Sequence, residues 1–146
     1  MMRGAALLLC SSMAMAGCNS APVEPVTVTK ARDNIHTWNG RIITVQGWLG
    51  NCQGYDCGIY PTLPEAKSVM SDDPHSSQWQ SAMNRRLSIG TAYDFDEKAA
   101  PLQFQQVSIQ AVLSDVCRGW DRGCTDRAPD LVPLSIVVLH PAKKAN

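Results

Sequence analysis

Six cysteines are the residues of this 146-residue chain with the most evident chemistry. Four of them form two local pairs: four residues separate Cys52 from Cys57, and six separate Cys117 from Cys124. Thiols spaced in this way can close two short disulfide loops or ligate a zinc ion. Zinc sites with four cysteine ligands usually use pairs separated by two residues, so the observed spacings favour disulfides. Three pairings of the four thiols remain possible, and we expect the two local ones.

The other residues that could do chemistry do not form a recognised catalytic pattern. The three histidines, His36, His75 and His140, are far apart in the sequence and form no HExxH pair. The chain also has no Gly-x-Ser-x-Gly motif, no phosphate-binding loop and no dinucleotide-binding glycine motif. The acidic cluster at residues 94–97 lacks the rest of a calcium-binding loop and is typical of the first turn of a helix. We therefore expect no catalytic residues, no cofactor and no bound metal.

The first eighteen residues resemble the signal peptide of a bacterial lipoprotein. Arg3 precedes an apolar stretch over residues 5–16, which is shorter than the roughly 20 apolar residues of a transmembrane helix. The stretch ends in Met15-Ala16-Gly17-Cys18, which resembles a lipobox, where small residues precede a cysteine that is lipidated and becomes the mature N-terminus. An ordinary secretory signal peptide with a chance cysteine is the alternative.

This resemblance implies an address and an anchor. Acyl chains such as palmitate on Cys18 would hold the mature chain on a membrane, since each buried methylene contributes about 0.8 kcal/mol. Asn19 stands where aspartate would resemble an inner-membrane retention signal, so we expect the periplasmic face of the outer membrane. Residues 18–28 contain two prolines and are expected to form the lipidated N-terminus and an extended tether. The oxidising envelope is also where disulfides persist.

The remaining residues, 29–146, are enough for a single domain. Loss of residues 1–17, with Arg3, leaves the mature chain with a net charge of about −1, which offers no electrostatic footprint for duplex nucleic acid. After Cys18 the sequence has no apolar segment long enough to span a membrane.

Alternation of apolar and polar residues predicts five strands. Two similar segments, 43–49 and 107–113, have apolar residues or glycine at every second position and include several β-branched residues, as half-buried strands do. Shorter runs at 57–60, 87–90 and 134–139 complete the set.

Short helices are expected between these strands. Thr62 and Glu65 have the spacing of a capping box at the start of a brief helix. Asp73 and Pro74 suit the N-cap and first residue of a second helix. Residues 94–100 suit a third.

This order of elements resembles the OB-fold, a five-stranded Greek-key barrel. The segment 39–49 (NGRIITVQGWL) resembles the opening strand of many OB domains, and the overall resemblance extends over residues 39–139. The insertion at residues 62–86 departs from a compact OB domain. The sequence therefore predicts a mainly β fold with short helices, arranged as a small five-stranded OB-like barrel, with a small β-sandwich as the alternative.

The OB resemblance also implies a working surface. The two disulfide loops would follow the first and fourth barrel strands, where loops flank the usual ligand face. The residues that we expect on that face are aromatic or basic: Trp48, Tyr55, Arg118, Trp120 and Arg122. Such groups suit an oligosaccharide or single-stranded nucleic acid, but packing on the disulfide and pairing with nearby aspartates is the alternative.

Together these features favour a non-enzymatic binding or interaction module anchored to a membrane. Its partner would be another envelope protein or a glycan. A hydrolase or other enzyme on a β scaffold, or a purely structural envelope protein, are the alternatives, because a fold does not determine a function.

Overall fold

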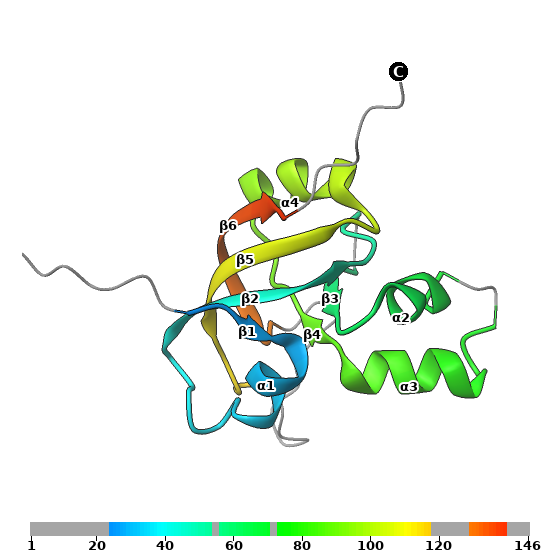
Figure 1. Ribbon diagram of the computed structural model, residues 1–146, viewed down its shortest axis with the longest axis horizontal. Helices are drawn as coiled ribbons and strands as arrows, with labels where there is room; N and C mark the ends of the chain where they lie inside the picture. The colour runs from blue at the N-terminus through cyan, green and yellow to red at the C-terminus, as the bar shows by residue number, and fades with distance from the viewer. Residues whose placement is uncertain (1–23, 54–55, 71–72, 118–128, 140–146) are drawn as a thin grey trace, which may run out of the picture.

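The computed structural model describes residues 24–53, 56–70, 73–117 and 129–139, and these form a mainly antiparallel β-sheet with short helices (Figure 1). The strands are β1 (Val26–Thr27), β2 (Ile42–Leu49), β3 (Gly58–Tyr60), β4 (Leu87–Ser88), β5 (Gln106–Leu113) and β6 (Leu131–Val138). Their order in the sheet is β4-β3-β2-β5-β6, and β1 pairs with β2 off this path. The helices are α1 (Val28–Asp33), α2 (Leu63–Ser68), α3 (Ser77–Arg85), α4 (Tyr93–Ala99) and the 3-10 helix η1 (Ala100–Leu102).

The two segments that resemble each other in sequence lie side by side as β2 and β5. They pair in antiparallel register, with Ile43 opposite Ala111 and Val45 opposite Ile109. All four of these side chains are buried, as period-two alternation predicts for a strand with one face on a core. The expected pair of long strands is thus confirmed, and it forms the centre of the hydrophobic core.

Strand β6 begins three residues before its expected start. Leu131 is its first residue, and Pro133 lies inside the strand opposite Ala111. Proline cannot donate to a ladder, which is why the sequence pattern stopped short of it, but proline is tolerated where a strand forms the edge of a sheet. The register also shifts between Gln110 and Ala111, next to this proline.

The two ends of the sheet order meet at one point. Ile89, just after β4, forms a parallel bridge with Leu131 at the start of β6. The Gly90 N–H donates to the Leu131 carbonyl oxygen at 2.8 Å, and the Asp130 N–H donates to the Ser88 carbonyl oxygen at 3.0 Å. In the described part of the chain, β4 and β6 are therefore joined only where β6 begins.

The folded part of the chain begins before residue 29, the expected start of the domain. Val26 and Thr27 pair in parallel with Val45 and Gln46 of β2. Val28 is fully buried, and its Cγ2 lies where a Cβ on Gly47 would come within 2.6 Å. The last residues of the expected tether are therefore packed on the sheet.

Helices α2 and α3 form the insertion that the OB resemblance did not explain. The expected start of α2 at Thr62 is confirmed, because the Thr62 hydroxyl accepts the Glu65 N–H at 3.4 Å. The Glu65 side chain accepts from the Thr62 hydroxyl at 2.7 Å, where a capping box would have it accept the Thr62 backbone N–H. The expected start of α3 is wrong. Asp73 instead accepts the His75 N–H in a turn, and Ser76 caps the helix. Asp and Ser offer similar short acceptors, so sequence alone does not decide which of them caps.

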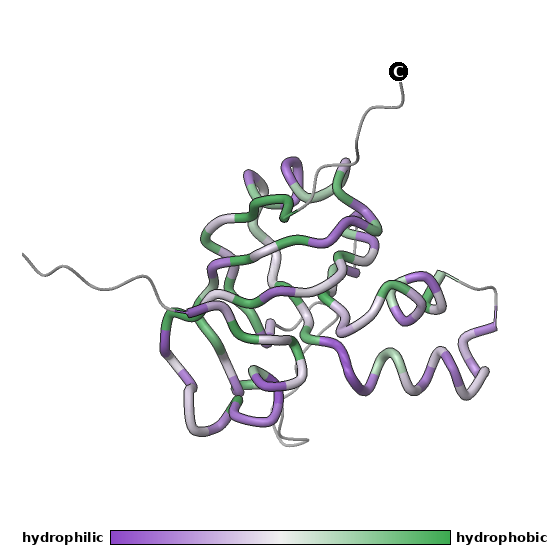
Figure 2. Tube along the Cα trace, viewed as in Figure 1, coloured by the Kyte–Doolittle hydropathy of each residue, from purple (hydrophilic) through white to green (hydrophobic). Residues whose placement is uncertain are grey.

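A second, small hydrophobic cluster lies under this insertion. Its members are the buried Tyr60, Ala66 and Ala82 and the partly buried Trp48, Val69 and Phe104. Apolar residues follow the strands of the sheet, whereas the surface of α3 is largely polar (Figure 2). Among the described residues, the helices are too short or too polar to cross a membrane.

Candidate functional site

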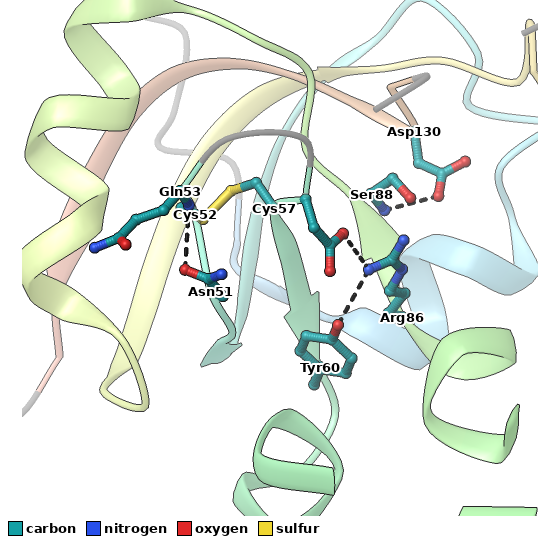
Figure 3. Close-up of polar contacts among 9 residues, drawn as sticks. Asn51, Cys52, Gln53, Cys57, Tyr60, Arg86, Ser88 and Asp130 are labelled. Atoms are coloured by element: carbon teal, nitrogen blue, oxygen red, sulfur yellow. Dashed lines mark hydrogen bonds and ion pairs between the residues drawn. A yellow bond between two sulfur atoms is a disulfide. The ribbon is translucent and has the colours of Figure 1, made fainter. Parts of the chain in front are cut away.

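A disulfide between Cys52 and Cys57 closes the loop that joins β2 to β3. Both cysteines are buried, and the loop is braced by the Asn51 side chain, whose Oδ1 accepts the Gln53 N–H at 3.2 Å (Figure 3). This is the local pairing that the spacing favoured. Cys117, after β5, is also disulfide-bonded, and Cys124 lies outside the described residues.

Arg86 is the centre of a polar cluster beside this loop. Its Nη1 donates to Asp56 Oδ1 at 2.6 Å and to the Tyr60 hydroxyl at 3.2 Å. The Arg86 side chain is 13% exposed and the Asp56 side chain 45% exposed, so the pair lies at the boundary between protein and solvent. We call Asp56, Tyr60 and Arg86 the arginine cluster.

The local sequence explains how these three side chains meet. Arg86 caps the end of α3 and precedes β4, while Asp56 precedes β3 and Tyr60 ends it. Because β3 and β4 are antiparallel, Arg86 at the start of β4 lies opposite Tyr60 at the end of β3, and the long arginine side chain runs past Gly58 to Asp56. Gly58 leaves room for the arginine, since a Cβ there would come within 3.2 Å of Arg86 Cδ.

A second carboxylate ties the same region to β6. Asp130 is buried, and its Oδ2 accepts the Ser88 N–H at 2.9 Å (Figure 3). The backbone of Asp130 donates in return to Ser88, as described above. Asp130 thus fixes the start of β6 against β4 beside the arginine cluster.

Burial and charge act on the ionisable groups of the cluster. Burial is the largest influence on Tyr60 and raises its pKa above the usual range, although the nearby Arg86 partly opposes this. For Arg86, burial acts to lower the pKa, but Tyr60 and Asp56 together outweigh it, so the net pKa is raised. Near neutral pH the cluster therefore holds a protonated phenol, a guanidinium cation and the Asp56 side chain.

The three groups of the arginine cluster differ in how far they reach solvent. The Asp56 carboxylate is partly exposed and can accept hydrogen bonds from outside the domain, whereas Arg86 is mostly buried and Tyr60 is buried, so these two mainly position Asp56. A histidine and a carboxylate also lie close together outside the arginine cluster, with His36 Nδ1 2.9 Å from Asp115 Oδ2. Its imidazole is 75% exposed and projects from the loop between α1 and β2.

The sequence predictions for the ligand face fall mostly outside the described residues. Tyr55, Arg118, Trp120 and Arg122 lie there, and so does the expected lipidation site, Cys18. Trp48 is described, and it is half-buried in the small cluster under α2 and α3, in which Tyr60 also takes part. Trp48 therefore packs beside the arginine cluster.

Sequence reasoning missed the arginine cluster itself. Its hydrogen bonds join residues 30 and 26 positions apart, a separation at which local pattern carries no signal. The sequence offered one hint, since Arg86 comes immediately before the predicted strand 87–90. Successive side chains of a strand point to opposite faces, so the side chain next to a core residue points away from the core.

Two grooves lie outside this cluster. One, of about 480 Å³, runs between α2 and α3 and is lined by Thr62, Pro64, Glu65, Ser68, Ser77, Gln78, Ser81 and Arg85. The other, of about 360 Å³, lies between α4 and β6. In the described part of the chain, no group of three or more His, Cys, Asp or Glu side chains is placed to hold a metal ion.

The chain matches no family model, no curated protein and no solved structure.

Proposed function

We propose that this protein is a lipid-anchored lipoprotein of the bacterial cell envelope whose folded domain is a non-enzymatic binding module. The lipobox-like Met15-Ala16-Gly17-Cys18 supports the anchor. The eight residues from Cys18 to Pro25 then lead to the first strand, and even fully extended they span at most roughly 29 Å. The domain would therefore work close to the membrane surface, on the periplasmic face of the outer membrane.

The architecture that we propose for the domain is an OB-like barrel. Strands β2 to β6 follow one another in the order and pairing of that fold, with α4 between the third and fourth of them. The parallel contact between Ile89 and Leu131 is where such a barrel would close. Strand β1 and the α2–α3 insertion are additions to that plan.

The binding face that we propose surrounds the arginine cluster. The observation that carries it is the positioned Arg86–Asp56 pair beside the Cys52–Cys57 loop, at the end of the sheet where the β2–β3 loop and the start of β6 meet. Loops in these places flank the ligand face of OB domains. The α2–α3 insertion buries Tyr60, so the accessible part of this face is its rim at Asp56 and the disulfide loop.

The partner that we favour is another envelope protein, and a glycan is the alternative. The Arg86 cation is already balanced by Asp56, which disfavours a polyanion such as nucleic acid. A half-exposed ion pair on a rim is a common means of orienting a protein partner.

Site-specific photo-crosslinking in intact cells tests this face. A photoreactive phenylalanine analogue replaces Gln53, an exposed residue of the disulfide loop, or Gln80, an exposed residue of α3, as the matched control. We expect the probe at position 53 to give a discrete crosslinked envelope protein that the probe at position 80 does not give. The same products from both positions, or none from position 53, would refute a protein partner at this face.

Membrane fractionation tests the anchor separately. A Cys18→Ser variant removes the thiol that would be acylated, so we expect it to leave the membrane fraction. Uncleaved apolar residues 5–16 could also hold the variant in the membrane, so the measurement is restricted to chains that have lost residues 1–17. Retention of those chains at the level of the unaltered protein would contradict lipidation of Cys18.

A further inference from the structure

Among the described residues, the outer edge of β6 pairs with another strand only at its first residue. Leu131 contacts Ile89 and Gly90, and no other described residue pairs with that edge of the strand. At the far end, the Leu139 N–H donates to the Gln106 carbonyl oxygen of the neighbouring chain segment. Because backbone groups of successive residues alternate between the two edges of a strand, Val138 and Ile136 direct theirs to the open edge.

A groove runs along this edge, with α4 as its second wall. It has a volume of about 360 Å³ and is lined on one side by residues 133–136 of β6. Ala92, Asp94, Phe95 and Lys98 line the other side. Its lining residues place the groove between α4 and β6, which lie side by side in Figure 1.

Strand β6 has only part of the protection that edge strands normally carry, because Pro133 and the register shift beside it affect its first half and leave residues 135–138 regular. It contains no charged residue over its eight positions, and neither does the adjacent strand β5 or the strand after that, β2. Natural edge strands are usually protected by charges, by prolines or by being short. Pro133 protects one position here, while Leu134 and Val137 are 53% and 64% exposed.

We propose that this groove binds an extended segment of another polypeptide, which adds to the sheet as a strand beside β6. Backbone groups of Ile136 and Val138 would form the new ladder, and the exposed apolar side chains of β6 would pack against alternate residues of the segment. This is a second interaction surface, distinct from the face around Arg86, and it depends neither on that face nor on the lipid anchor.

The helical wall determines what kind of segment fits. A folded edge strand, including β6 of a second copy, would bring its own neighbouring elements against α4, whereas an unfolded terminus or linker would not. Asp94 and Lys98 are exposed on this wall, and neither forms an ion pair with another described residue. The segment would therefore carry alternating apolar residues, with polar or oppositely charged residues facing α4.

Amide hydrogen exchange of the full-length mature protein in detergent tests whether the edge is open. We expect the amides of Ile136 and Val138 to exchange at least about tenfold faster than those of Ser135 and Val137, which face β5. Equal protection of all four amides would overturn the proposal. So would protection of positions 136 and 138 that grows with protein concentration, because it would show that a second copy occupies the edge.

Selection from a phage-displayed library of random twelve-residue peptides tests the occupant. Lys98→Trp places bulk in the groove, and Glu97→Trp places the same bulk on an exposed neighbouring position of α4 that does not line it. We expect the selected peptides to have apolar residues at alternate positions. They should bind the Glu97→Trp protein as tightly as the unaltered protein, and the Lys98→Trp protein at least about tenfold more weakly. No enrichment, no alternation, or equal binding to both variants would overturn the proposal.

Discussion

Replacement of Arg86 by methionine tests whether the arginine cluster holds its end of the sheet together. Methionine keeps most of the aliphatic length but removes the guanidinium, so it leaves Asp56 and the Tyr60 hydroxyl without their shared partner. The Tyr60 residue is 1% exposed, so its phenol cannot regain water without a local rearrangement. Asp56 is 45% exposed and can be rehydrated.

The expected cost follows from these two exposures. An unsatisfied buried hydroxyl costs about 1–3 kcal/mol, and the loss of a half-exposed ion pair adds on the order of 0–1 kcal/mol after solvent screening. We therefore expect Arg86→Met to lower the free energy of unfolding by about 1–4 kcal/mol. Adding Tyr60→Phe removes the stranded hydroxyl, so the double variant should be destabilised by less than the sum of the two single changes.

Urea unfolding of the oxidised mature protein measures these differences, provided that the slope of the transition is unchanged. Arg41→Met is the matched control, because Arg41 is exposed, and it should change the stability by no more than about 0.5 kcal/mol. An Arg86→Met protein as stable as the Arg41→Met protein, or strict additivity with Tyr60→Phe, would refute the reasoning.

Three other changes test separate parts of the structure. Gly47→Ala should lower the free energy of unfolding by about 1–3 kcal/mol, because the alanine Cβ would lie 2.7 Å from the Tyr60 carbonyl oxygen. An unchanged free energy of unfolding in urea would show that this close contact is absent. Joint replacement of Cys52 and Cys57 by alanine should lower the free energy of unfolding by about 2 kcal/mol, because the disulfide no longer restricts the unfolded chain. The comparison is with the unaltered protein under oxidising conditions, and an unchanged free energy of unfolding would contradict a stabilising disulfide. The raised pKa of Tyr60 implies that the folded state retains this proton when the unfolded state releases it, so stability should fall as the pH rises above about 10. In the Tyr60→Phe variant, the free energy of unfolding should fall less between neutral pH and pH values above about 10 than it does in the unaltered protein. An equal fall in both proteins would argue against a buried phenol at position 60.

The elements that the sequence predicts best are those set by local alternation. Strands β2 and β5 have apolar residues at every second position, and the structure buries that set in the core. The start of β6 was missed because Pro133 interrupts the usual strand pattern, although its place at a sheet edge makes it tolerable. The start of α3 was misplaced because two nearby short polar residues compete to cap it.

The arginine cluster and the groove beside β6 depend on the fold as a whole. Arg86 meets Asp56 and Tyr60 only because β3 and β4 pair, and the groove exists only because α4 lies alongside β6. Neither arrangement corresponds to a local motif that could be recognised in the sequence. By contrast, the lipobox-like segment is a local motif, so it could be proposed from the sequence without the fold.

Intact-mass analysis of the protein from a membrane fraction tests the central claim most directly. A lipoprotein anchored through Cys18 should appear as a chain that begins at this cysteine and carries the added mass of its acyl chains. A mature chain cleaved at another residue, or one that begins at Cys18 without added lipid mass, would contradict the account.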